Sequence, residues 1–270
     1  SAWTLLRTLC GNGTGGATNA RAQRARPYSP FLHPCVQTAL VYMGFLPAVW
    51  GVKMWDVLFA AAYKLSARES VVLFEEMAHL LPCVHCRTSY GTYLSQVAPR
   101  ACIKEGDTRS AARWVWMMHD MVNQKLGHSS MPFARVEARH AVFDEYVTPS
   151  DVLHVMALMA LDLEREEDAD AYARAAPSLC ALLIALEGPP ACAVAVEDDM
   201  CTAAGAWVHA LTCRNAFRRA RGGSPLSRGA FMRHYAPCRA PDADNVIEHA
   251  TTHHAPQPSR VSRRPSRRHR

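Results

Sequence analysis

Residues 71–94 read VVLFEEMAHLLPCVHCRTSYGTYL, and this stretch decides how the chain folds and which chemistry it can carry. Residues 71–80 repeat apolar side chains at helical spacing, and Pro82 ends that run. Cys83 and Cys86 follow at once, separated by two residues. A second apolar pattern with helical spacing then begins. The stretch therefore predicts two helices that meet at a pair of cysteines.

Helical spacing of apolar residues continues on both sides of this stretch. Only 14 of the 270 residues are glycine, and alanine, leucine, methionine and arginine are abundant, which favours helices over strands. The segments with helical spacing cover approximately residues 36–43, 55–62, 71–80, 83–94, 109–126, 150–163, 179–186 and 203–219. Ser150 is the expected cap at the start of one helix, and Gly127 at the end of another. We therefore predict an all-α fold, a helical bundle followed by a second helical domain.

Composition divides the chain into four parts. Residues 1–30 are rich in glycine, arginine and proline and are expected to form a flexible segment. Residues 31–147 form the first helical domain and residues 148–238 an additional one. Residues 239–270 lose apolar periodicity, so we expect a disordered tail. This Arg-rich tail carries much of the net charge of +6, so the body of the protein does not have the charge of a nucleic-acid binder.

Two common functional signals are weak or missing. The spacing Gly-x-Gly-x-x-Gly at residues 11–16 has no strand before it and no acidic residue until Asp56, so dinucleotide binding is not expected there. The longest clean apolar run in the C-terminal half is Leu179–Leu186. Since a bilayer requires ~20 apolar residues, no membrane span is predicted.

The cysteine pair is the strongest chemical signal. The chain has ten cysteines, and only Cys83 and Cys86 lie close together in the sequence. At a helix N-terminus, unpaired N–H groups and the helix dipole favour a thiolate, which can exchange disulfides with a substrate. His85 could add a positive neighbour. The pattern therefore indicates a redox-active dithiol.

Three other sites use similar spacing. A zinc site could in principle combine Cys83, Cys86, Cys102 and His119, although the chain has no second close pair of ligands. A c-type haem requires histidine directly after the second cysteine, where Arg87 stands. A thioredoxin fold requires strands around the motif, and only helical patterns surround it. The cysteine spacing alone leaves the redox and zinc alternatives open.

Two further segments resemble a known family. Residues 50–62, WGVKMWDVLFAAA, resemble the WGxxxWxxLHxxA stretch of the Erv/ALR sulfhydryl oxidases. Residues 116–127, WMMHDMVNQKLG, resemble that family's CxxHNxVNxKLG stretch. The order and spacing of the three motifs also match, and the resemblance covers approximately residues 31–146. With its added C-terminal helical region, the chain resembles in architecture the longer members of the family that large DNA viruses encode.

The resemblance implies a helical bundle that holds FAD. Cys86 would face the flavin, and Cys83 would exchange with the thiols of reduced protein substrates. Electrons would pass through FAD to oxygen and give hydrogen peroxide. No metal is expected. The implied FAD contacts are Gly51, Trp55, Phe59, Cys86, Trp116, His119, Asp120, Val122, Asn123, Lys125 and His128.

Five positions depart from the family pattern. Phe59 replaces a histidine, Asp120 an asparagine and His128 a lysine. Trp116 and Phe133 stand where the family has a second, structural disulfide. Loss of such a bridge typically costs ~2–4 kcal/mol, which the second helical domain could offset.

Partners are predicted with less detail. The family pairs as a homodimer through its first helices, and Val36, Leu40, Met43 and Phe45 offer an apolar stripe for such pairing. A cysteine on the flexible segment, Cys10 or Cys35, could relay electrons from a protein substrate to Cys83. The basic tail could bind nucleic acid or an acidic partner.

Two alternatives to an active oxidase remain at this point. One is a helical interaction protein that a metal or disulfides stabilise. The other is an oxidase-derived scaffold without activity.

Overall fold

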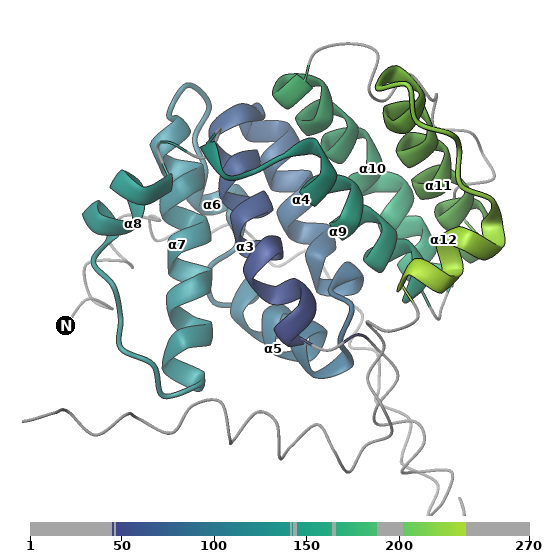
Figure 1. The fold of residues 1–270 in the computed structure, drawn as a ribbon. Helices are drawn as coiled ribbons and strands as arrows, with labels where there is room; N and C mark the ends of the chain where they lie inside the picture. Colours follow the sequence, from purple (N-terminus) through teal and green to yellow (C-terminus); the bar gives the residue numbers. More distant parts are fainter. Residues whose placement is uncertain are drawn as a thin grey trace, which may run out of the picture.

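The computed structural model describes residues 45, 47–140, 142, 145–163, 166–187 and 202–235. The predicted flexible segment, the first part of the apolar stripe and the basic tail lie outside the described residues. Figure 1 shows ten labelled helices: α3 (Pro47–Lys64), α4 (Ala67–Leu80), α5 (Val84–Leu94), α6 (Pro99–Cys102), α7 (Thr108–Lys125), α8 (Phe133–His140), α9 (Pro149–Leu161), α10 (Glu166–Glu187), α11 (Ala203–Ala220) and α12 (Arg228–Tyr235). The described part contains no strand, only isolated bridge residues such as the pair Lys104 and Asp107. The predicted all-α class is confirmed.

The helices form two regions, α3–α8 and α9–α12, and both contribute side chains to one buried core. In the first region α3 lies against α7, and α4 lies against α5 (Figure 1). In the second region α9 packs against both α10 and α11, which also contact each other. Helix α10 packs along α4, where Arg174 donates two hydrogen bonds to Glu76, at 2.6 and 2.9 Å. The predicted boundary after residue 147 falls between α8 and α9, and the second region packs directly on the first.

The N-terminal caps explain where several helices begin. Ser66 and Glu69 form a capping box before α4. The prediction that Ser150 caps α9 is wrong, because Ser150 lies inside this helix. Thr148 caps this helix instead: its hydroxyl accepts from the Asp151 N–H, and Pro149 takes the first helical position.

Helix α10 is much longer than the predicted segment 179–186. It covers 22 residues and includes Pro177 in its interior, which interrupts the expected sequence pattern. Its stretch Glu167–Glu187 is long and apolar enough to cross a membrane by composition, a candidate that the sequence analysis did not find. Because 61% of the apolar window is buried within the fold, this is weak evidence for a span, and a core helix has the same composition.

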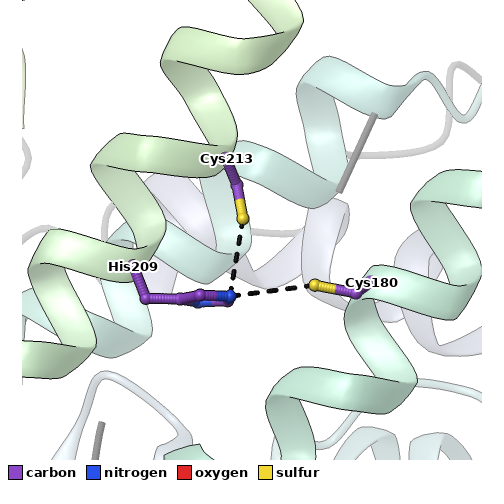
Figure 2. A group of neighbouring side chains, drawn as sticks. All are labelled: Cys180, His209 and Cys213. Carbon is purple, nitrogen blue, oxygen red and sulfur yellow. Dashed lines mark hydrogen bonds between the residues drawn. The ribbon is translucent and has the colours of Figure 1, made fainter. Parts of the chain in front are cut away.

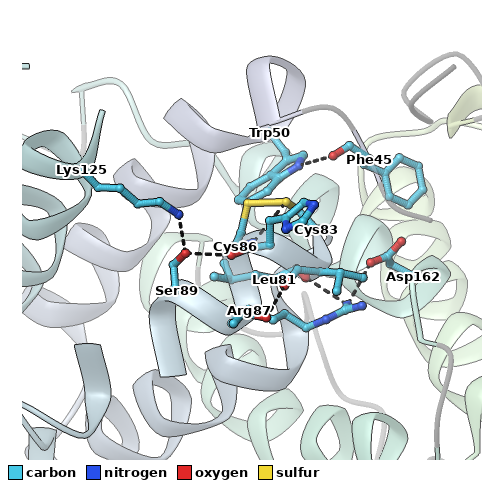
Figure 3. Close-up of a disulfide and its surroundings, with 12 residues drawn as sticks. Phe45, Trp50, Leu81, Cys83, Cys86, Arg87, Ser89, Lys125 and Asp162 are labelled. Atoms are coloured by element: carbon cyan, nitrogen blue, oxygen red, sulfur yellow. Dashed lines mark hydrogen bonds and ion pairs between the residues drawn. A yellow bond between two sulfur atoms is a disulfide. The ribbon is translucent and has the colours of Figure 1, made fainter. Parts of the chain in front are cut away.

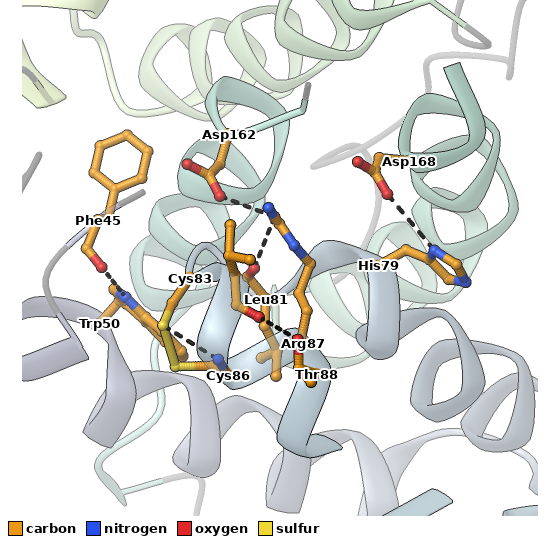
Figure 4. A network of polar contacts seen from close by, with 11 residues as sticks. Phe45, Trp50, His79, Leu81, Cys83, Cys86, Arg87, Thr88, Asp162 and Asp168 are labelled. Carbon is orange, nitrogen blue, oxygen red and sulfur yellow. Dashed lines mark hydrogen bonds and ion pairs between the residues drawn. A yellow bond between two sulfur atoms is a disulfide. The ribbon is translucent and has the colours of Figure 1, made fainter. Parts of the chain in front are cut away.

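One buried ion pair joins the two regions. The Arg87 guanidinium, on α5, donates to the carboxylate of Asp162 at the end of α9, at 3.0 Å, and to the Leu81 carbonyl at 3.1 Å (Figure 4). The exposed fractions are only 8% for Arg87 and 6% for Asp162. The pair therefore fixes the start of α5 to the second region through groups that are withdrawn from water.

We expect Arg87→Met to destabilise the protein by ~3–5 kcal/mol, because the substitution leaves a buried carboxylate without its cation. Urea unfolding of the full chain measures this change. Arg100→Met is the matched control, since Arg100 pairs with Glu75 at an exposed site and such pairs contribute ~0–1 kcal/mol. Equal losses in the two variants would contradict a specific role for the Arg87–Asp162 pair.

Candidate redox site

Cys83 and Cys86 form a disulfide at the N-terminus of α5, with their Cα atoms 5.1 Å apart (Figure 3). Cys83 is the N-cap residue, and its sulfur accepts from the Cys86 N–H at 3.3 Å. The Arg87 N–H donates to the Cys83 carbonyl at 2.9 Å. The sequence prediction that the pair stands at a helix start agrees with this geometry. In the disulfide form, neither sulfur can serve as a thiolate ligand of the alternative zinc site.

Trp50 lies beside this disulfide. Figures 3 and 4 both show its indole next to the two sulfur atoms. The indole N–H donates to the Phe45 carbonyl at 2.9 Å, and the Phe45 N–H donates to the Pro82 carbonyl at 2.8 Å. These bonds hold the start of α3 against the loop before α5. Both cysteines are half-buried and His85 between them is exposed, so the motif lies at the surface of the fold.

An aromatic cluster lies farther along α3, where it meets α7 and α8. The rings of Trp55 and His119 are 4.7 Å apart between centroids. Phe59 contacts His119 edge-on at 6.5 Å and stacks on His140 at 3.9 Å. The structure therefore brings together three of the predicted FAD contacts, Trp55, Phe59 and His119. Trp50 and Phe59 are nine residues apart on α3, or roughly 14 Å of helix, so α3 runs from the side of the disulfide to the aromatic cluster.

Sequence analysis missed three residues of this cluster. His140 contacts Phe59, and its Nδ1 shares a hydrogen bond with the Tyr146 hydroxyl. The Arg139 charge acts on both His119 and His140. His140 and Arg139 lie outside the three motifs, and α8 has too few apolar residues for the periodicity to predict it.

Burial keeps both histidines neutral. It lowers the pKa of His119, and it lowers that of His140 from an ordinary 6.5 to about 4. The positive charge of Arg139 lowers both values further. Burial also raises the pKa of Tyr146 to about 12. At neutral pH the cluster thus offers neutral imidazoles and a neutral phenol, with Arg139 as a nearby cation.

The other predicted contacts lie along α7 and beyond its end. The half-buried Val122 and Asn123 occupy its last turns. The Gly127 backbone has φ +73°, and the His128 N–H donates to the Asn123 carbonyl at 2.8 Å, which closes a Schellman motif. The Lys125 side chain reaches α5, where its ammonium donates to the Ser89 hydroxyl at 2.5 Å (Figure 3). These residues form no single cluster with Trp55 and His119 in the described contacts.

Trp116 and Phe133 contact each other where the family pattern has a disulfide. Their ring centroids lie 5.7 Å apart, and the Trp116 indole donates to the Met131 carbonyl at 2.8 Å. The Arg113 guanidinium lies 5.3 Å from the centre of the Phe133 ring. Aromatic contacts of this kind contribute roughly 0.5–1.5 kcal/mol beyond their buried area. They therefore replace only part of the stability that the family's structural disulfide would contribute at these positions.

Three observations fit a flavin dinucleotide. Trp55 and His119 offer ring surfaces on which a flat ring system could pack. Asp120 Oδ1 is buried, and none of the described groups donates to it, although a hydroxyl of a bound molecule could. A Cβ added to Gly51 would meet no described atom within 4 Å, so a cofactor could approach the α3 backbone there.

The lowered pKa of His140 predicts how stability depends on pH. Between its folded value of about 4 and the ordinary 6.5, the unfolded chain binds a proton that the folded chain does not. The free energy of unfolding should therefore fall as pH drops through this window, and the slope should flatten in His140→Gln. Urea unfolding at several pH values measures the slope. The exposed His85 supplies the control substitution His85→Gln, and an unchanged slope in His140→Gln would refute the assignment.

Comparison with known proteins adds one finding. Residues 52–141 match the family model described as the Erv1 / Alr family, a segment that runs from α3 through the end of α8. No curated protein and no solved structure matches the chain. The match contains both cysteines of the disulfide and the aromatic cluster around His119. Over these residues the chain is therefore similar to the Erv1/Alr family.

Proposed function

We propose that this protein is an FAD-linked sulfhydryl oxidase with Cys83 and Cys86 as its redox pair. The observation that carries the proposal is the Cys83–Cys86 disulfide at the N-terminus of α5, inside the segment that matches the Erv1/Alr model. A disulfide in this position can be reduced readily, because the helix N-terminus stabilises the thiolate that reduction releases.

The two cysteines have different roles. A thiolate of the substrate attacks Cys83, the sulfur–sulfur bond breaks, and Cys86 leaves as a thiolate. A second substrate thiol then attacks the mixed disulfide, so the substrate gains a disulfide and the pair holds two electrons. Cys86 passes these electrons onward. A bound FAD would supply the electron acceptor, and the two electrons, with the two protons from the substrate thiols, would convert oxygen to hydrogen peroxide.

The surrounding residues support this chemistry. Trp50 keeps one side of the disulfide covered, while the exposed His85 leaves the motif accessible to substrate. Trp55 and the neutral His119 would contact the cofactor, and Arg139 would balance part of its phosphate charge. The predicted contact Phe59 is only 1% exposed and stacks on His140, so it would support these side chains from behind rather than contact the cofactor itself. Asp120 is better suited to a cofactor hydroxyl than to a phosphate, because a carboxylate accepts hydrogen bonds and repels a phosphate.

Dimerisation through the N-terminal stripe stays a proposal with one correction. Phe45 is only 2% exposed and belongs to the core of its own chain, so it cannot serve as part of an exposed interface stripe. Val36, Leu40 and Met43 lie outside the described residues. Binding of the basic tail to nucleic acid or an acidic partner also stays untested.

The purified full chain should be yellow with non-covalently bound FAD, and His119→Gln should lower the flavin content per chain. The absorption spectrum and release of the cofactor by heat measure both. His154→Gln is the matched control, because His154 is also half-buried but lies on α9 outside the cluster. A folded chain that takes up no added FAD would eliminate the flavin part of the proposal.

Cys83→Ser and Cys86→Ser should each abolish oxidation of a dithiol while FAD stays bound, since exchange requires one sulfur and onward transfer the other. Oxygen consumption with reduced dithiothreitol is the assay. Thr88→Ala is the control on the exposed side of the same helix, and it should retain activity. Activity in either cysteine variant would move the redox centre elsewhere.

A further inference from the structure

A second group of sulfur and nitrogen atoms lies in the C-terminal region. Cys180 on α10 and His209 and Cys213 on α11 point toward one another (Figure 2). The Nε2 atom of His209 is 3.5 Å from the Cys213 sulfur and 3.8 Å from the Cys180 sulfur. All three residues are buried, and the three ligand atoms lie within 4.8 Å of one another.

These separations suit a tetrahedral zinc ion. Zn–S bonds of about 2.3 Å and Zn–N bonds of about 2.0 Å place a sulfur and a nitrogen ligand about 3.5 Å apart, and two sulfurs about 3.8 Å apart. The two observed nitrogen–sulfur distances, 3.5 and 3.8 Å, are close to the first value. The two sulfur atoms lie within 4.8 Å of each other, so they can reach the second value by an approach of about 1 Å or less. Two thiolates and an imidazole are a ligand set that favours zinc over harder cations such as magnesium.

The imidazole is held in the orientation that a ligand requires. The hydroxyl of Tyr172, from α10, lies 3.2 Å from His209 Nδ1, so Nε2 faces the two sulfurs. Metal-ligating histidines commonly use their second nitrogen in this way, which fixes both the tautomer and the ring plane. His209 and Cys213 are four residues apart on α11, and one helical turn places them on the same face.

Burial of this group has a chemical consequence. It raises the pKa of Cys213 to about 12 and lowers that of His209. Without a cation, the thiol therefore stays protonated and the imidazole neutral. A bound divalent ion would supply the positive charge that two buried thiolates require.

Cys180 is disulfide-bonded in this structure. A dithiol reductant breaks that bond: the reductant becomes a disulfide, and Cys180 and its partner each become a thiol. Zinc binding then displaces one proton from Cys180 and one from Cys213. The metal site belongs to the reduced state of the C-terminal region.

We propose that Cys180, His209 and Cys213 form a zinc site that reduction of the Cys180 disulfide opens. The three ligands leave one tetrahedral position for a fourth ligand. The group is hard to predict from the sequence, since Cys180 is separated from His209 by 29 positions and the His-x₃-Cys pair on α11 is a weak signal alone.

The test uses the full chain carrying Cys83→Ser and Cys86→Ser, so that the reduced pair on α5 cannot bind the metal. The protein is reduced with dithiothreitol without oxygen, freed of reductant and exposed to zinc, and bound metal is measured by mass spectrometry. We expect about one zinc ion per chain after reduction and none in the oxidised protein. Cobalt in place of zinc should give a near-ultraviolet thiolate-to-metal charge-transfer band.

The variants separate a metal site from a packed core. His209→Gln and Cys213→Ser should lose the ion, and Tyr172→Phe should weaken zinc affinity ~10–100-fold by freeing the imidazole. His154→Gln should bind zinc like the parent chain. No zinc and no cobalt band in the reduced, folded parent would overturn the proposal, whatever the variants do. Equal binding by the oxidised protein, or by folded His209→Gln, would also overturn it.

Discussion

The placement of Cys83 as the N-cap of α5 is the constraint on which the rest of the site depends. The cap puts both sulfurs at the positive end of a helix, where a thiolate is stabilised. Three contacts from distant parts of the chain maintain that position. The Phe45 N–H binds the Pro82 carbonyl, Trp50 lies beside the disulfide, and Arg87 reaches the buried carboxylate of Asp162.

Helix α3 connects this redox pair with the aromatic cluster. Trp50 lies near the disulfide at one end, and Phe59 contacts His119 and His140 toward the other. A cofactor held along α3 would therefore lie between the electron donor and a neutral, largely buried imidazole. The second helical region contributes support rather than site residues: α10 packs on α4, and the end of α9 supplies Asp162. The family pattern has a structural disulfide at the positions of Trp116 and Phe133. The packing of α10 on α4, together with the Trp116–Phe133 contact, offers physical compensation for its absence.

Much of the fold and the core of the site could be predicted, because both depend on local patterns. The 3.6-residue spacing of apolar side chains predicted α3, α4, α5, α7, α9 and α11, and the cysteine spacing predicted that Cys83 and Cys86 lie together at a helix start. The rest depends on contacts between distant segments. The short helices α6, α8 and α12 contain too few residues for a periodic pattern to predict them, and Pro177 concealed most of α10. His140 and Arg139 come near His119 only when α8 folds back on α7, and the Cys180–His209–Cys213 group forms only when α10 and α11 pack together.

Anaerobic titration of the purified flavoprotein with a dithiol tests the central claim most directly, with the flavin absorbance as the readout. If electrons enter at Cys83 and leave through Cys86, dithiol should bleach the flavin in the native chain and leave it oxidised in Cys86→Ser. Bleaching at the same rate in Cys86→Ser, or a folded native chain whose bound flavin the dithiol does not reduce, would contradict the account.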